Sequence, residues 1–179
     1  IENATGLHGP SNAIAAIIGR ANLQLGDAVA PVFDALQAAS PTRFRGIRHS
    51  VTSDPHPEAA GSTNREPGIL GEASFRVGAK ILASRGLTFE AWLYHPQLHE
   101  LADFARAVPE LTIILNHVGG LTRVGPYADD PERTLATWRD GIADVAKDRQ
   151  PGIANSGSKK RPRGGDDGGS GGGGGGGHG

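Results

Sequence analysis

Short apolar runs alternate with helical patterns four times before Gln150, and this alternation constrains the fold more than any other feature of the sequence. Each run is short enough to be a strand, and each following segment places apolar residues at helical spacing. The expected strands are 13–18, 43–51, 88–94 and 111–116. Strands that alternate with helices predict an α/β fold, in which helices pack on a parallel sheet.

The helical segments begin and end at residues that favour helix termini. Asp27 is a good N-cap for the first helix, with Pro31 in its first turn, and Gly86 is a suitable stop for the second. The third helix is expected between Pro96 and Pro109. The residues expected to face inward are Val29, Val32, Phe33 and Leu36, then Leu70, Phe75, Ala79 and Leu82, then Leu98, Leu101, Ala102, Ala105 and Val108, and finally Leu135, Trp138, Ile142 and Val145.

The composition changes at Gln150. Half of the 28 glycines follow this residue, including the uninterrupted run 171–177. A segment so poor in large apolar side chains cannot offset the entropy that it would lose on ordering. We therefore expect one folded domain over 1–150 and a disordered tail over 151–179, and we assign the basic run 159–163 to that tail rather than to nucleic-acid binding.

The overall composition excludes several function classes. The chain has no cysteine, so disulfides and thiolate metal sites are unavailable, and its net charge of −1 predicts no attraction to nucleic acid or anionic membranes. No apolar run approaches the roughly 20 residues of a membrane span. We expect a cytoplasmic protein whose partner is a small-molecule substrate. The chain begins at Ile1 without a methionine, which predicts a fragment.

Polar side chains gather where three of the expected strands end, as Arg48-His49, Tyr94-His95 and Asn116-His117. Periodicity alone allows either an open doubly wound sheet or a (β/α)8 barrel. In a barrel the C-terminal ends of the strands converge on one mouth, where active sites are built, whereas an open sheet would spread them along an edge. The three polar clusters therefore favour the barrel.

Three segments of the chain resemble the amidohydrolase-2 family of metal-dependent hydrolases. They are 44–49 (FRGIRH), 91–98 (AWLYHPQL) and 114–120 (ILNHVGG), and the resemblance extends from about Thr5 to about Lys147. The family includes lactonases that act on 2-pyrone-4,6-dicarboxylate and on L-fucono-lactone. The resemblance implies a (β/α)8 barrel that hydrolyses a lactone or amide bond in a small carboxylate- or sugar-derived molecule, with a divalent cation such as zinc or manganese.

The resemblance also implies roles for the strand-end residues. His117 matches a histidine that ligates the metal or polarises the substrate carbonyl, and the residues matching substrate-binding positions are Arg48, His49, Tyr94, His95 and Asn116. A carboxylate-bearing substrate suits Arg48, because the guanidinium fork pairs with a carboxylate through two bonds. Simpler roles stay open, since His117 can be a core histidine and His95 can cap the helix that follows it. The pair Gly119-Gly120 is expected to let the backbone approach the substrate.

The sequence also departs from the family pattern. The family begins with a His-x-His pair and needs an aspartate after its eighth strand, and this chain has no His-x-His and only four expected strands. A complete barrel takes roughly 250 residues. We therefore expect a partial barrel that binds no metal by itself. The alternative to a hydrolase is an inactive fragment that associates through open strand edges, at the runs beginning with Ala13 and Leu111.

Overall fold

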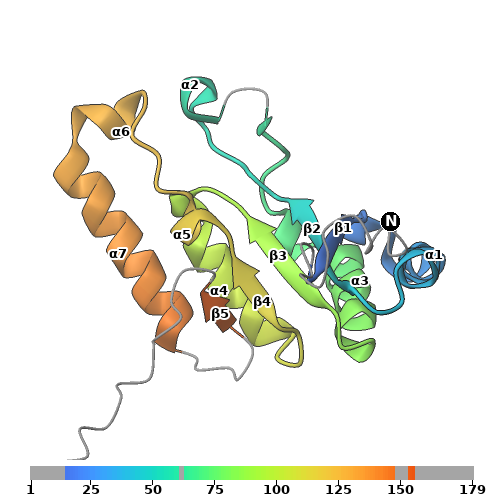
Figure 1. The fold of residues 1–179 in the computed structure, drawn as a ribbon. Helices are drawn as coiled ribbons and strands as arrows, with labels where there is room; N and C mark the ends of the chain where they lie inside the picture. Colours follow the sequence, from blue (N-terminus) through green and yellow to red (C-terminus); the bar gives the residue numbers. More distant parts are fainter. Residues whose placement is uncertain (1–14, 61–62, 148–152, 156–179) are drawn as a thin grey trace, which may run out of the picture.

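A computed structural model describes residues 15–60, 63–147 and 153–155, in which five strands form one parallel sheet (Figure 1). The strands are β1 (Ile17–Arg20), β2 (Phe44–Ser50), β3 (Thr88–Trp92), β4 (Ile113–Leu115) and β5 (Ile153–Asn155). They follow one another in the order β1-β2-β3-β4-β5, and each neighbouring pair is parallel. The predicted parallel sheet in sequential order is confirmed for all four expected strands.

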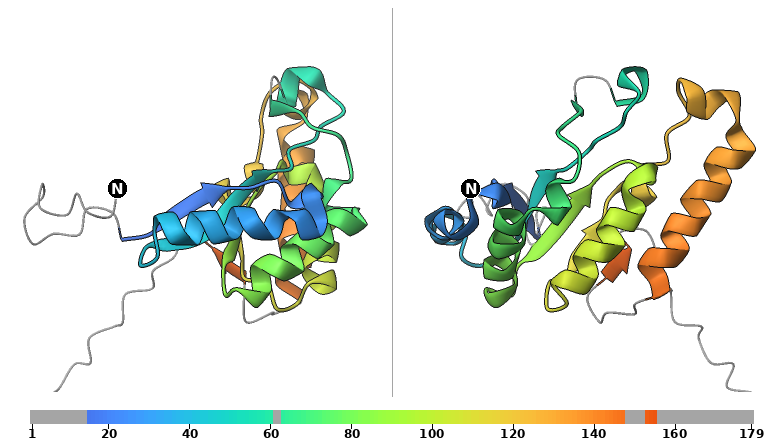
Figure 2. Two further views of the ribbon diagram at one scale, coloured as in Figure 1. Left: turned by 90° about the vertical axis from the view of Figure 1, so that its right-hand side faces the viewer. Right: turned by 180° about the vertical axis from the view of Figure 1, so that it is seen from behind.

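Four longer helices form a row along the sheet (Figure 2). They are α1 (Ala30–Ala39), α3 (Ala73–Ser84), α4 (Leu98–Ala107) and α7 (Pro131–Lys147). The shorter helical segments are η2 (Leu23–Val29), α2 (Pro57–Ala60), η4 (Ile69–Gly71), η5 (His95–Gln97), α5 (His117–Gly120) and α6 (Pro126–Asp129). In the described part of the chain, no helix is both long and apolar enough to cross a membrane.

The first strand and the first helix differ in position from the prediction. Ala15 and Ala16 are not part of β1, which begins at Ile17, where the backbone N–H bonds the carbonyl of Arg43. The side chain of Asn22 caps the next segment by accepting from the N–H of Gln24 at 3.0 Å. Helical structure therefore starts four residues before the predicted cap at Asp27, because Asn22 and His49 accept from the free N–H groups of Gln24 and Leu23.

The predicted tail contains a strand, so the expectation of no regular structure after Gln150 is wrong at Ile153–Asn155. This segment pairs in parallel with Ile113–Leu115. The glycine-rich composition of the region concealed a short segment whose backbone completes the hydrogen bonds of β4. The prediction of an open edge at Leu111 is wrong for the same reason, since the outer strands of the described sheet are β1 and β5. The rest of the predicted tail lies outside the described residues.

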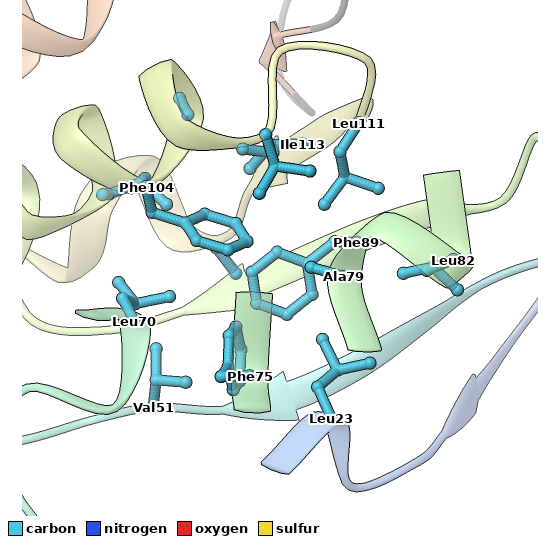
Figure 3. Packing of buried hydrophobic residues seen from close by; sticks show 14 of the residues in the cluster. Leu23, Val51, Leu70, Phe75, Ala79, Leu82, Phe89, Phe104, Leu111 and Ile113 are labelled. Carbon is cyan, nitrogen blue, oxygen red and sulfur yellow. The ribbon is translucent and has the colours of Figure 1, made fainter. Parts of the chain in front are cut away.

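The hydrophobic core lies between the sheet and the helices, around three phenylalanines (Figure 3). Phe75 of α3, Phe89 of β3 and Phe104 of α4 meet edge to face, with ring centroids 5.5–5.8 Å apart. The residues predicted to face inward from the helices at α3 and α4 are all buried. Of the four residues predicted to face inward from α7, Val145 is buried and the other three are half-buried, because α7 stands at the end of the row of helices.

Candidate functional site

The sheet has a second face, opposite the helices, which carries polar residues. Along β3, Phe89 and Ala91 are buried in the core, while Glu90 and Trp92 alternate with them and point the other way. We call this surface the inner face, because it is the side of the sheet that a closed barrel would enclose. A depression of about 400 Å³ lies on it, lined by Ile18, Gly19, Arg20, Arg48, Ser50, Glu90 and Trp92.

A charged network crosses three strands of the inner face. Arg48 on β2 lies opposite Glu90 on β3 in the strand register. Its Nε and Nη2 atoms both donate to Oε2 of Glu90, at 2.9 and 2.5 Å. The same oxygen accepts from Nδ2 of the buried Asn116, after β4, at 3.3 Å. Arg20 pairs with Arg48 in register on the other side, so two cations and one carboxylate meet in the depression.

His117 directly follows the inner-face residue Asn116 and adopts an unusual backbone conformation. Its φ is 51° and that of Val118 is 53°, a left-handed conformation that is costly for residues with a Cβ. The turn is held by Trp138, whose Nε1 donates to the Val118 carbonyl at 2.7 Å. The exposed His117 ring lies edge to face with Trp92, with the centroids 6.2 Å apart. Strained non-glycine residues cluster at functional sites. His117 is a residue of this kind, and it lies just after the end of β4.

The glycine pair after His117 serves protein packing. A Cβ on Gly120 would lie 2.0 Å from the carbonyl oxygen of Leu93, and one on Gly119 would lie 2.9 Å from Cδ2 of Leu98. Both glycines also have positive φ angles. The close approach expected at these glycines is thus found toward β3 and α4, not toward the inner face.

Tyr94 and Gln97 join the segments that follow β2 and β3. The hydroxyl of Tyr94 lies 2.7 Å from Oγ1 of Thr63. The buried Gln97 accepts from the backbone N–H of Ser53 at 2.8 Å and donates from Nε2 to the carbonyl of Val51 at 2.8 Å. The two strand ends are therefore held together by side chains. Gln97 was not predicted from the sequence, because a glutamine at the start of a helix usually faces solvent.

His49 lies on the core side of β2. Its Nδ1 accepts from the backbone N–H of Leu23 at 3.2 Å, and its ring lies 5.3 Å from that of Phe75. Burial lowers its pKa, the positive charges of Arg20 and Arg65 lower the pKa further, and Glu72 opposes them. His49 still borders a second depression of about 390 Å³ beside Arg20 and Arg48. Its role in substrate binding stays a prediction.

His95 is buried away from the charged network. Only 1% of its surface is exposed, and its ring lies 4.8 Å from that of Tyr127. Burial lowers its pKa, against the opposing effects of Asp54 and of a hydrogen bond to the Gly120 backbone. The alternative in which His95 caps the following helix is wrong, because η5 begins at His95 itself and Tyr94 occupies the N-cap position. Its assignment to the substrate pocket stays a prediction.

Strand ends predicted to share one edge of the sheet do share it. Arg48, Tyr94 and His117 all lie toward the C-terminal ends of their strands, and Asn116 joins Arg48 through Glu90. Arg20, Glu90 and Trp92 were not predicted from the sequence. The signal that could have found Glu90 and Trp92 is their alternation with the apolar residues Phe89 and Ala91 along the strand.

The described residues do not fit the zinc or manganese site that the family resemblance implies. A zinc site usually has about three protein ligands. Within 15–60, 63–147 and 153–155, no group of three or more His, Cys, Asp or Glu side chains could hold a metal ion. The role of His117 as a metal ligand stays a prediction.

Comparison with known proteins identifies the family. The family model for amidohydrolases (Amidohydro_2) matches residues 13–150, which is well over half of the chain. The chain belongs to the amidohydrolase family. A protein of Sinorhizobium fredii, named "Uncharacterized protein y4mH", is 36% identical over 104 residues, which cover 58% of this chain and 32% of that protein.

Solved amidohydrolases share the fold. An amidohydrolase from Burkholderia multivorans with bound HEPES matches with a TM-score of 0.58 and 21% identity, covering 82% of this chain and 45% of that one. A structure of a Burkholderia multivorans amidohydrolase with bound zinc matches with a TM-score of 0.56 and 19% identity, covering 79% of this chain and 43% of that one. This chain thus spans less than half the length of these amidohydrolases. Its fold is part of a (β/α)8 barrel, as predicted.

Proposed function

We propose that the chain carries the substrate-binding surface of a hydrolase that opens a lactone or amide bond in a small carboxylate- or sugar-derived molecule. The observation that carries the proposal is the arginine pair of the inner face, where Arg48 is held by Glu90 and lies in register with Arg20. Membership of the amidohydrolase family supports the reaction class.

The geometry suits an anionic substrate. Arg48 presents its Nε and Nη2 edge to Glu90, which fixes the plane of the guanidinium and leaves Nη1 without a hydrogen bond to any described residue. Arg20 adds a second positive charge to the same depression, so one carboxylate of Glu90 does not neutralise it. A substrate carboxylate would bind these donors through charge-assisted hydrogen bonds. Trp92 offers an adjacent ring face for the lactone ring.

In the proposed reaction, the oxygen of a water molecule bonds to the substrate carbonyl carbon, the C–O or C–N bond breaks, and a proton passes to the leaving oxygen or nitrogen. His117 stands at the strand end next to Trp92, where its ring can donate a hydrogen bond to the carbonyl oxygen. Hydrolysis also needs an activated water and a base held at the same place. Glu90, the carboxylate of this depression, is bound to Arg48 and Asn116. We therefore propose that this chain by itself binds the substrate without turning it over.

A second candidate function is association with a like or complementary chain. It is favoured by the sheet edges, because β1 and β5 each have one strand neighbour among the described residues. Unpaired strand edges promote pairing with other chains. Sedimentation equilibrium of the full chain across a hundredfold range of concentration tests this candidate, and a single monomeric species throughout would reject it.

Calorimetric titration tests the proposed substrate class. The full chain is titrated with a carboxylate-bearing lactone and with its methyl ester, alongside Arg48→Gln. The control is Arg45→Gln, which lies on the same strand but bonds backbone carbonyls of Thr42 and Phe44. We expect the acid to bind more tightly than the ester, and Arg48→Gln to remove that preference while the control keeps it. Equal binding of acid and ester to the unmodified chain would reject the anionic substrate class.

A further inference from the structure

Four consecutive residues after β4, those of α5, adopt positive φ angles and form one left-handed turn. The angles are 51° at His117, 53° at Val118, 79° at Gly119 and 57° at Gly120. The N–H of Gly119 donates to the carbonyl of Asn116 at 3.0 Å and closes the turn. Glycine adopts this conformation readily, whereas a β-branched residue such as Val118 rarely does. The first half of the turn therefore needs support from its surroundings.

The two strained side chains do not supply this support by their own burial. His117 is exposed, and 47% of the surface of Val118 is exposed. Support comes from α7, where Nε1 of Trp138 donates to the carbonyl of Val118 at 2.7 Å. A hydrogen bond of this kind shifts an equilibrium by roughly two- to tenfold. Trp138 therefore favours the left-handed form of the turn.

Trp138 is itself fixed by the packing of α7. Trp138 and Ile142, one helical turn apart, are half-buried against the hydrophobic core, and Val145 on the same face is buried in it. Cδ1 of Ile142 lies 3.4 Å from the position that a Cβ on Gly119 would occupy. The indole N–H thus reaches the turn from a packed helix that lies against it.

The left-handed turn decides where the His117 ring points. A return of His117 to an ordinary helical φ near −63° would rotate its Cα–Cβ bond by roughly 110° about the N–Cα bond. In the present turn the ring lies edge to face with that of Trp92, with the centroids 6.2 Å apart. Trp92 lines the inner-face depression. A relaxed turn would therefore move the His117 ring away from its place beside that depression.

We propose that Trp138 is a positioning residue, which acts through the Val118 carbonyl to keep the His117 ring where it donates to the carbonyl oxygen of a bound lactone. This inference rests on the function proposed for the inner face. The guanidinium of Arg48 is held separately, by Glu90. The contact with the substrate carbonyl and the contact with its carboxylate can therefore be measured independently.

The first part of the experiment compares variants of the full chain by NMR. Trp138→Phe keeps a ring and removes the Nε1 donor, whereas the control Val145→Ala loosens the packing of α7 two turns away and keeps that donor. Trp138→Phe combined with Val118→Asn is the rescue, because asparagine adopts positive φ more readily than valine. The readouts are the NOE between the rings of His117 and Trp92, and the intraresidue NOE between the amide and α protons of His117, which is strong at positive φ.

The second part measures ligand preference by calorimetry. The probes are the lactone 5-oxotetrahydrofuran-2-carboxylate and tetrahydrofuran-2-carboxylate, which has the same ring and carboxylate without the ring carbonyl. We expect the unmodified chain and Val145→Ala to show both NOEs and to bind the lactone at least threefold more tightly than the other probe. Trp138→Phe should lose both NOEs and this preference while still binding both probes, and the rescue variant should regain what was lost.

Persistence of the NOEs or of the lactone preference in Trp138→Phe would overturn the proposal. Equal losses in Val145→Ala, or no recovery in the rescue variant, would overturn it as well. Failure of the unmodified chain to bind either probe, or to prefer the lactone, would instead count against the function proposed for the inner face. The NOEs of the free chains would then still decide whether Trp138 positions His117.

Discussion

Arg48 and Glu90 face each other across neighbouring strands, and the guanidinium Nη2 lies 2.5 Å from the carboxylate Oε2. The arginine side chain is 43% exposed, so solvent screens the pair. The pair therefore contributes little to folding, and we infer that its main effect is to hold a cation in place on an otherwise open sheet face.

The first prediction concerns the energy of this pair. A double-mutant cycle with Arg48→Gln and Glu90→Gln, measured by urea unfolding, should give a coupling energy of at most about 1 kcal/mol, because exposed ion pairs are weak. Arg45→Gln on the same strand serves as the matched single change. A coupling well above about 2 kcal/mol would mean that the pair is a folding element.

The second prediction concerns Gly120. An alanine at this position would have to adopt a φ of 57°, and its Cβ would lie 2.0 Å from the carbonyl oxygen of Leu93. The ends of β3 and β4 would therefore have to move apart. Gly68→Ala is the control, since Gly68 has a φ of 80° with nothing within 4 Å. The control should lose roughly 1–2 kcal/mol of unfolding free energy from backbone strain alone. Gly120→Ala should lose clearly more, and equal losses would contradict the packing described here.

The third prediction concerns the aromatic core. Phe75→Ala removes a fully buried ring that contacts Phe89, Phe104 and His49. Thermal or urea unfolding should show a loss of about 3–5 kcal/mol, as for other buried phenylalanines. Val77→Ala, on the exposed side of the same helix, should change the stability by less than about 1 kcal/mol. Comparable losses from the two changes would place α3 in a different orientation.

The fourth prediction concerns pH. Burial, with Arg20 and Arg65, holds the pKa of His49 below its ordinary value of 6.5, so the folded chain binds fewer protons than the unfolded chain below that pH. The stability that this histidine contributes is present above pH 6.5 and is lost as the pH falls through its lowered pKa. Urea unfolding between pH 7.5 and 5 should show this decline, and His49→Gln should flatten it. The exposed change Leu25→Gln should leave the slope unaltered, and an equal slope in His49→Gln would contradict the assignment.

The sequence predicted the sheet well, because the period of the apolar residues directly reflects burial. Phe75, Ala79 and Leu82 are buried as their helical spacing indicates. Strand β5 could not be anticipated, because three residues in a glycine-rich context carry almost no pattern and become a strand only through pairing with β4. Tertiary pairing therefore decided the structure there.

The candidate site was less predictable than the sheet. Arg48 and Asn116 could be placed at strand ends, yet their connection runs through Glu90, whose face becomes evident only from the register of β2 and β3. His49 follows Arg48 and His95 follows Tyr94 in the sequence. The pleat of β2 directs His49 toward Leu23 on the core side, and the turn at η5 places His95 against Tyr127. Spacing along the chain could not reveal these directions.

We propose that this chain binds a carboxylate- or sugar-derived lactone on its inner face without hydrolysing it. The most direct measurement incubates the full chain with a panel of sugar lactones and added zinc or manganese, while NMR follows both ligand binding and hydroxy-acid release, with His117→Ala as the matched variant. We predict saturable binding and no release above the rate without protein, for both chains. Release by the unmodified chain that His117→Ala abolishes would show that the chain is a working enzyme and that binding without turnover is wrong.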